Sequence, residues 1–216
     1  MLVTPMRRIV SLLPSATEIV YALGEGNSLV GVSHECDFPK EAMTKPKIIE
    51  PIFDSGTLAS DQIDRLVSQS LKKGERLYKI KLDELKKADP DLIITQELCD
   101  VCAIGAADIL EAVNQLGKRV DVISLNPHSL TDVKQDIRKV ADALGLGENA
   151  ERFVRELEDK AETIRGLTEK TTRPRVRCLE WLDPIMNAGH WVPEIVELAG
   201  GHDALASRAK FSTYID

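Results

Sequence analysis

Cysteine and histidine side chains gather in short segments that follow apolar, strand-like runs of the chain. His34 and Cys36 follow one such run, Cys99 and Cys102 follow another, and His128 follows a third. Thiolate and imidazole groups are ligands for zinc, iron and cobalt, and a cysteine beside a helix N-terminus can become nucleophilic. These segments are therefore the first candidates for a metal, redox or ligand-binding site.

Cys99 and Cys102 have the two-residue spacing that is common among thiolate ligands of metals. A structural zinc site usually contains a second such pair, whereas Cys36 and Cys178 are single and far apart in the sequence. One prediction is a zinc or iron site made of Cys36, Cys99, Cys102 and His34. The other is that these cysteines are small, partly buried thiols that line a pocket.

Trp181 and Trp191 are the only tryptophans, and they flank one loop. Two indoles beside one loop can form the wall of a site for a planar ligand, or they can be ordinary core residues. His190 directly precedes Trp191, and an imidazole there can ligate cobalt, iron or zinc in a pH-dependent way. His128 lies in a turn, where it can instead bond to its own backbone.

The sequence contains none of the common nucleophile or nucleotide motifs. It has no GxSxG elbow, no GxxxxGK[ST] loop and no GxGxxG after a strand. The residues by themselves therefore single out no catalytic set. A metal-dependent or thiol enzyme that uses the cysteine and histidine segments is one possible function.

Composition and charge exclude several classes of protein. The 216 residues include 28 basic and 35 acidic side chains, with a net charge of -7 and a pI of about 5.2, so we expect no nucleic-acid partner. Apolar residues make up 43%, as in globular proteins. No signal-peptide pattern and no apolar run of roughly 18–20 residues is present, so we expect a soluble, cytoplasmic protein as encoded.

Strands and helices alternate over the first 130 residues, which predicts a parallel α/β sheet with helices on both faces. A capping box of Ser15 and Glu18 is expected to begin the first helix, and Gly24 to end it. Strands are expected at residues 8–13, 29–32, 91–95 and 120–125, and helices at 61–71, 82–88 and 106–116.

The pattern changes after residue 130. Two long amphipathic helices are expected at residues 131–144 and 148–167, followed by a strand at 176–180 and a helix from Pro193 to Gly200. The predicted domains are an N-terminal α/β lobe (1–130), a helical spacer (131–170) and a partial C-terminal α/β lobe (171–216). Ligands bind beyond the carboxyl ends of parallel strands, where the cysteines and histidines lie.

Four stretches resemble the cobalamin (vitamin B12) and iron-siderophore class of ABC-transporter substrate-binding proteins. They are residues 8–19 (RIVSLLPSATEI), 31–39 (GVSHECDFP), 85–94 (LKKADPDLII) and 196–201 (VELAGG). The HECD and ELCDVC segments are similar to those of its cobalamin-binding subgroup, and the resemblance covers residues 8–216.

The resemblance implies two Rossmann-like lobes joined by a long backbone helix at residues 148–167. A corrinoid such as cobalamin, or a related metal chelate, would bind in the cleft between the lobes, without catalysis, for delivery to an ABC permease or for intracellular corrinoid handling. By position, the implied ligand contacts are Pro14, Ser15, Ala16, His34, Glu35, Cys36, Phe38, Gln96, Glu97, Cys99, Asn126 and His128 of the first lobe and Trp181, Asp183, Asn187, His190 and Trp191 of the second.

The second lobe of this class continues past the point that matches Asp216. We therefore expect an incomplete second lobe that exposes apolar surface or completes itself with another chain, and hence a homodimer. A protein that acts only through protein contacts is a further alternative.

Overall fold

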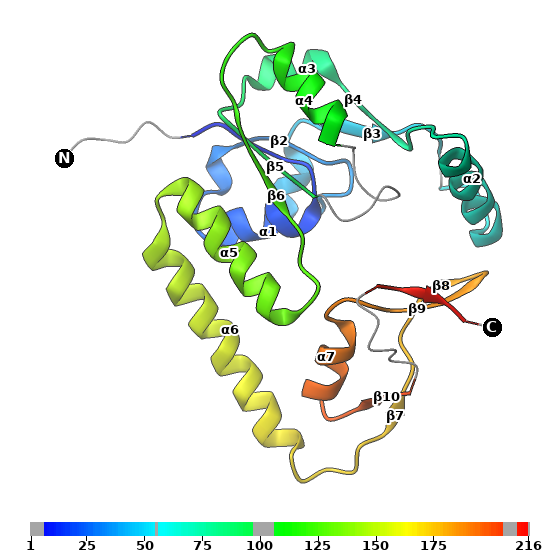
Figure 1. The fold of residues 1–216 in the computed structure, drawn as a ribbon. Helices are drawn as coiled ribbons and strands as arrows, with labels where there is room; N and C mark the ends of the chain where they lie inside the picture. Colours follow the sequence, from blue (N-terminus) through cyan, green and yellow to red (C-terminus); the bar gives the residue numbers. More distant parts are fainter. Residues whose placement is uncertain (1–6, 55, 97–105, 205–210, 216) are drawn as a thin grey trace. The chain divides into compact units, whose positions relative to one another are not determined.

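The computed structural model describes residues 7–54, 56–96, 106–204 and 211–215. The chain forms two compact units (Figure 1). Among the described residues, no helix combines the length and the apolar character that a membrane span requires. Unit 1 comprises Met1–Ser55, Val67–Asn126 and Val140–Leu146, and unit 2 comprises Gly56–Leu66, Pro127–Lys139 and Gly147–Asp216.

Unit 1 contains a four-stranded parallel sheet of order β2-β1-β5-β6. The strands are β1 (Ile9–Ser11), β2 (Leu29–Val32), β5 (Leu92–Gln96) and β6 (Asp121–Leu125). All of β1 and four of the five residues of β5 are buried, as expected for apolar strands with both faces covered. The predicted parallel α/β sheet is confirmed.

Helices cover both faces of this sheet. Val10 of β1 and its register partner Ile93 of β5 pack on one face with side chains of α3 (Leu82–Ala88) and α4 (Ala106–Asn114). Neighbouring strand residues point to the opposite face, where Figure 1 shows α1 (Pro14–Ala22). The predicted placement of helices on both faces is therefore confirmed.

The predicted capping box of α1 is wrong. Leu13 is the N-cap residue, and no side chain caps the helix. Pro14 occupies the first helical position, where its fixed φ favours helix and its missing N–H costs nothing, so Ser15 already lies inside the helix. The end of the helix is as predicted, because Gly24 adopts a left-handed φ of 91°.

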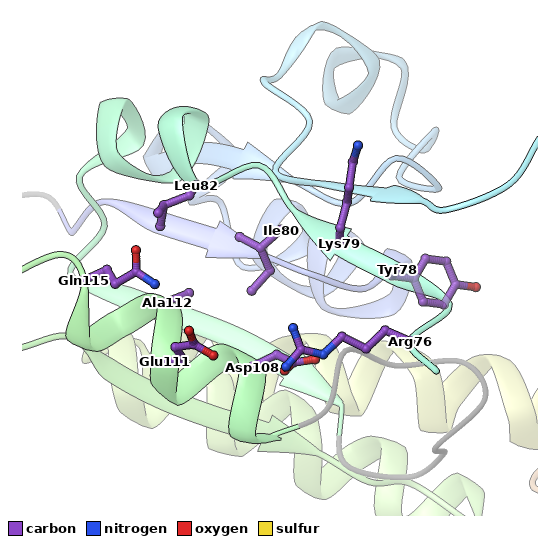
Figure 2. A pocket seen from close by; sticks show the side chains of 9 residues that line it. All are labelled: Arg76, Tyr78, Lys79, Ile80, Leu82, Asp108, Glu111, Ala112 and Gln115. Carbon is purple, nitrogen blue, oxygen red and sulfur yellow. The ribbon is translucent and has the colours of Figure 1, made fainter. Parts of the chain in front are cut away.

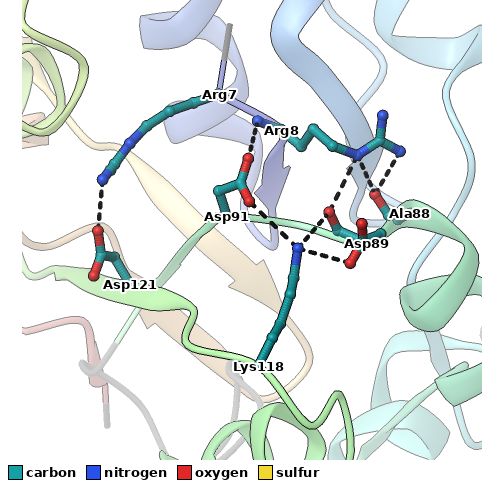
Figure 3. A network of polar contacts seen from close by, with 7 residues as sticks. All are labelled: Arg7, Arg8, Ala88, Asp89, Asp91, Lys118 and Asp121. Carbon is teal, nitrogen blue, oxygen red and sulfur yellow. Dashed lines mark hydrogen bonds and ion pairs between the residues drawn. The ribbon is translucent and has the colours of Figure 1, made fainter. Parts of the chain in front are cut away.

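Charged residues tie together the amino-terminal edge of the sheet (Figure 3). Arg7 pairs with Asp121 at 2.6 Å, and Lys118 pairs with Asp89 at 2.7 Å and with Asp91 at 3.3 Å. The backbone N–H of Arg8 donates to the Asp91 carboxylate, and this bond is the main cause that lowers the pKa of Asp91. These contacts fix the edge of the sheet opposite to the carboxyl ends of the strands.

Short segments complete unit 1. β3 (Ile49–Pro51) and β4 (Tyr78–Ile80) form an antiparallel pair that the sequence analysis did not predict. The 3-10 turns η1 (Gly26–Ser28) and η2 (Lys40–Thr44) flank β2. α2 (Ser60–Lys72) extends the expected helix by one residue at each end, and residues of both units belong to it.

Two long helices, α5 (Leu130–Leu144) and α6 (Gly147–Thr168), are present as predicted. Arg138 of α5 donates two hydrogen bonds to the Glu151 carboxylate of α6, at 2.6 and 3.1 Å. α5 contributes its first ten residues to unit 2 and its last turn to unit 1. The boundaries at residues 130 and 170 stay a prediction.

The rest of unit 2 consists of short strands and one helix. The prediction of one strand at residues 176–180 is wrong, because one strand ends at Val176 and a strand of another sheet begins at Leu179. The Cys178 carbonyl between the two strands accepts a hydrogen bond from the Ala188 N–H. The elements are β7 (Arg175–Val176) paired with β10 (His202–Asp203), β8 (Leu179–Leu182), β9 (Ile185–Asn187) and β11 (Thr213–Tyr214) in the order β11-β9-β8, and α7 (Val192–Leu198).

Candidate functional site

The carboxyl ends of the parallel strands collect the predicted ligand residues of unit 1. β1 has β2 on one side and β5 on the other, so the loops after β1 and β5 leave the sheet in opposite directions, which is where α/β sheets bind ligands. At this edge lie Pro14, Ser15 and Ala16 in the first turn of α1, His34, Glu35, Cys36 and Phe38 after β2, Gln96 at the end of β5 and Asn126 after β6.

His34 contacts an aromatic ring that the sequence analysis did not single out. The ring centroids of His34 and Tyr78 are 5.5 Å apart, and the His34 Nε2 lies 3.2 Å from a carboxylate oxygen of Glu35. Phe38, four residues on, exposes 62% of its surface. This loop therefore presents an imidazole, a carboxylate and an exposed phenyl ring together.

Cys36 is buried beneath this loop. It is 1% exposed, and the Thr17 hydroxyl donates to its sulfur at 3.1 Å. Burial raises the pKa of the Cys36 thiol above its ordinary value, which disfavours the nucleophilic thiolate. Ala16 is likewise buried, while Pro14 and Ser15 are exposed.

Unit 2 contains a compact cluster of rings, which we call the histidine cluster: His128, His190, Trp191 and Phe211. The His128 and His190 rings stack with centroids 5.7 Å apart and an interplanar angle of 14°. Phe211 meets both edge-on at 5.2 and 5.8 Å, and Trp191 lies 5.8 Å from His190. Both imidazole Nδ1 atoms are buried without a hydrogen-bond partner among the described residues.

The start of α5 positions His128. The Asp132 carboxylate accepts a hydrogen bond from the His128 N–H at 2.9 Å, and the Ser129 hydroxyl accepts one from the Asp132 N–H at 3.1 Å. The two bonds tie the first turn of α5 to the preceding residues, and the bond from His128 is the main cause that lowers the pKa of Asp132. The resemblance placed His128 with the first lobe, whereas the structure groups it with unit 2.

Gly189 and His190 position the other half of the cluster. A Cβ on Gly189 would lie 2.4 Å from backbone atoms of Phe211 and Ser212, so only glycine allows this close approach. His190 has a left-handed φ of 54°, which is uncommon outside glycine. The backbone therefore holds His190 and Phe211 in a constrained contact.

Trp181, Asp183 and Asn187 lie on the β8–β9 hairpin or in its turn. The Trp181 indole N–H donates to the Asp183 carbonyl at 3.0 Å. Asn187 is 3% exposed, and its side-chain oxygen accepts hydrogen bonds from the N–H and the hydroxyl of Thr213 at 2.8 and 2.7 Å. The Asn187 amide oxygen thus holds β11 to β9.

Unit 1 also contains a cavity of about 240 Å³ between β4 and α4 (Figure 2). Its wall includes the apolar side chains of Ile80 and Ala112 and the ion pair of Arg76 and Asp108. The lining residues, all in the described part of the chain, include no predicted ligand residue, although Tyr78 lines the cavity and contacts His34.

The predicted metal site receives no support from the described residues. Within residues 7–54, 56–96, 106–204 and 211–215, no group of three or more His, Cys, Asp or Glu side chains is arranged to hold a metal ion. Glu97, Cys99 and Cys102 lie outside the described residues. Zinc or iron binding by this chain stays a prediction.

The sequence profile of the periplasmic binding protein family matches residues 9–216. The chain belongs to this family. Members of the periplasmic binding protein family are substrate-binding proteins and not enzymes, and the resemblance to this class is confirmed.

Curated relatives of this periplasmic binding protein are longer than the chain. A vitamin B12-binding protein of Vibrio parahaemolyticus is 25% identical over 207 residues, which cover 95% of this chain and 63% of that protein. An uncharacterised ABC transporter substrate-binding lipoprotein of Bacillus subtilis is 28% identical over 173 residues, which cover 76% of this chain and 45% of that protein.

Solved structures of the family share its fold. The apo periplasmic heme-binding protein of Roseiflexus sp. RS-1 has a TM-score of 0.69 at 24% identity, over 97% of this chain and 70% of that one. The periplasmic vitamin B12-binding protein of Vibrio cholerae has a TM-score of 0.65 at 22% identity, over 98% and 71%. The predicted fold class, a helical-backbone binding protein, is confirmed, whereas the homodimer gains no support.

Sequence reasoning missed Tyr78 and Phe211. Tyr78 lies on β4, whose polar neighbours hide the strand signal, and Phe211 follows a segment without helical or strand periodicity. The alternation of apolar residues around Tyr78 and Ile80 was the one available signal. Neither contact with a histidine ring follows from spacing along the chain.

Proposed function

We propose that this chain binds a corrinoid, with related tetrapyrrole metal chelates as weaker ligands, and hands it to an ABC permease without chemical change. The observation that carries the proposal is the histidine cluster. Four ring side chains meet there, and two of them carry buried nitrogen atoms without partners. A planar, amphiphilic macrocycle suits such a surface because rings stack on its faces.

The relatives favour a corrinoid within this class. A curated relative aligned over 95% of the chain is named as a vitamin B12-binding protein, and residues 9–216 match the family profile. The exposed loop of His34, Glu35 and Phe38 supplies polar and aromatic contacts of the kind that fix the orientation of a ligand. The permease partner follows from the substrate-binding class of the family.

The test is an absorbance titration of the purified chain with cyanocobalamin, and separately with hemin. We expect a saturable change in the corrinoid spectrum, with tighter binding of cyanocobalamin than of hemin. Trp191→Ala and Phe211→Ala remove a ring from the cluster and should each weaken binding about tenfold, since one aromatic stacking contact contributes roughly 0.5–1.5 kcal/mol beyond its buried area.

A matched control is Leu167→Ala, an apolar truncation at a side chain of α6 that is 73% exposed. This variant should bind as the unmodified chain does. Equal losses in the control and the cluster variants would contradict a site at the histidine cluster. Hemin binding without corrinoid binding would reassign the ligand within the tetrapyrroles.

A further inference from the structure

Three side chains form a row across the small sheet of unit 2. Trp181 of β8 lies opposite Met186 of β9, and Met186 lies opposite Tyr214 of β11. Directly opposite residues in an antiparallel sheet point to the same face. Trp181, Met186 and Tyr214, which we call the ring row, therefore share one face.

The polar tips of the two rings are already bonded within unit 2. The Trp181 indole N–H donates to the Asp183 carbonyl at 3.0 Å, and the Tyr214 hydroxyl donates to the Asp64 carboxylate of α2 at 2.9 Å. With these tips bonded, the ring faces are apolar surface held in fixed positions. The thioether of Met186 between them is polarisable and packs well against rings.

All three side chains of the ring row are at least partly exposed. Tyr214 exposes 58% of its surface, and Trp181 and Met186 are only half-buried. α2, whose Asp64 holds Tyr214, has no buried residue of its own. A contiguous, partly exposed aromatic surface of this kind is suited to contact with an apolar face of a ligand.

The width of the row fits a macrocycle. Neighbouring strands are about 4.8 Å apart, so two spacings from β8 to β11 extend over about 10 Å, of the order of the width of a tetrapyrrole ring. The row also begins at Trp181, already a predicted ligand residue. We infer that the ring row is the flat wall against which one face of the macrocycle lies, with Asp64 as the residue that positions Tyr214.

This inference rests on the proposed function and makes it more specific. It assigns contacts with the corrin ring to Met186 and Tyr214. The sheet would then recognise the corrin ring itself rather than its substituents. The opposite face of the same hairpin offers a control, because Leu182 is 69% exposed there and lies next to Trp181 in sequence.

The experiment compares binding of cyanocobalamin and of cobinamide, which has the corrin ring without the nucleotide tail. Tyr214→Ala and Met186→Ala should each weaken both ligands by the same factor, about tenfold for the tyrosine. Tyr214→Phe keeps the ring and loses the bond to Asp64, so its loss should be smaller. Leu182→Ala should change neither affinity by more than about twofold.

Tryptophan fluorescence and far-UV circular dichroism establish that each variant is folded, and Tyr214→Phe remains informative if Tyr214→Ala does not fold. Unchanged affinity in Tyr214→Ala and Met186→Ala, an equal loss in Leu182→Ala, or a loss confined to cyanocobalamin would overturn the ring row alone. Failure of the unmodified chain to bind any corrinoid or porphyrin would overturn the proposed function and the ring row together.

Discussion

Replacement of Asn187 by alanine tests how β11 is held in unit 2. Asn187 is 3% exposed, and its side-chain oxygen accepts two hydrogen bonds from Thr213, at 2.8 and 2.7 Å. The substitution removes both bonds, which connect β11 to β9. Phe211 and Tyr214 adjoin or belong to β11, so the same bonds position a ring of the histidine cluster and a ring of the ring row.

The expected loss of stability follows from the two bonds. A hydrogen bond inside a protein contributes about 1 kcal/mol net, so Asn187→Ala should destabilise unit 2 by about 2 kcal/mol. With a urea m-value of about 2 kcal/mol/M, the unfolding midpoint should fall by about 1 M. Tryptophan fluorescence is a selective probe, because both tryptophans of the chain lie in unit 2.

Thr213→Val is the matched partner variant. It removes the hydroxyl and keeps the backbone N–H, so it should cost about half as much as Asn187→Ala. In a double-mutant cycle the two changes should show a coupling energy of about 1 kcal/mol, since the lost hydroxyl bond is shared. A shift below about 0.5 kcal/mol for Asn187→Ala, or strictly additive effects in the cycle, would refute this account of β11.

Three further predictions concern unit 1 and α6. Gly31→Ala places a Cβ 2.5 Å from the buried Ile48 side chain and should lower stability by about 1–3 kcal/mol in urea unfolding followed by circular dichroism, whereas Gly166→Ala, in open space within α6, should stabilise by about 0.5–1 kcal/mol. Hydrogen bonds from the ammonium groups of Lys79 and Lys81 lower the pKa of Glu50 from 4.5 to about 2. The contribution of Glu50 to folding stability is therefore present above pH 4.5 and is lost as the pH falls through about 2; a Glu50 pKa near 4.5 in an NMR titration would contradict this. Ellman's reagent should modify Cys36 only at the rate of unfolding, and Cys36→Ser should abolish that slow phase; rapid reaction in the native state would show that the thiol is accessible.

Local patterns in the sequence were sufficient for much of the fold. The apolar run of β2 and the helical spacing of α3 gave the observed bounds to the residue. In both cases local preference and tertiary packing agree, so the pattern is enough. Gly24 ends α1 as predicted because a left-handed residue is a local requirement.

Other elements depend on contacts that spacing does not encode. β3 and β4 are three residues each and are separated in the sequence by α2, so neither run is long enough to show strand periodicity. Their pairing is stabilised in part by the ion pairs of Glu50 with Lys79 and Lys81. The expected strand at 176–180 splits because its two halves pair with different partners.

The candidate site shows the same division. His128, His190 and Trp191 stood out by residue type and by their place after strands, but their stacking and the edge-on contact with Phe211 come from tertiary packing. The ring row needed the register of β8, β9 and β11, which only the folded chain provides. Residue types therefore identified the rings, and the structure showed which of them meet.

The most direct test of the central claim is a calorimetric titration of the purified chain with cyanocobalamin. We predict one site per chain, a dissociation constant in the micromolar range or below, and loss of the heat signal when Trp191 and Tyr214 are both replaced by alanine. Absence of heat and of any spectral change at high micromolar cyanocobalamin would contradict the proposal that this chain is a corrinoid-binding protein.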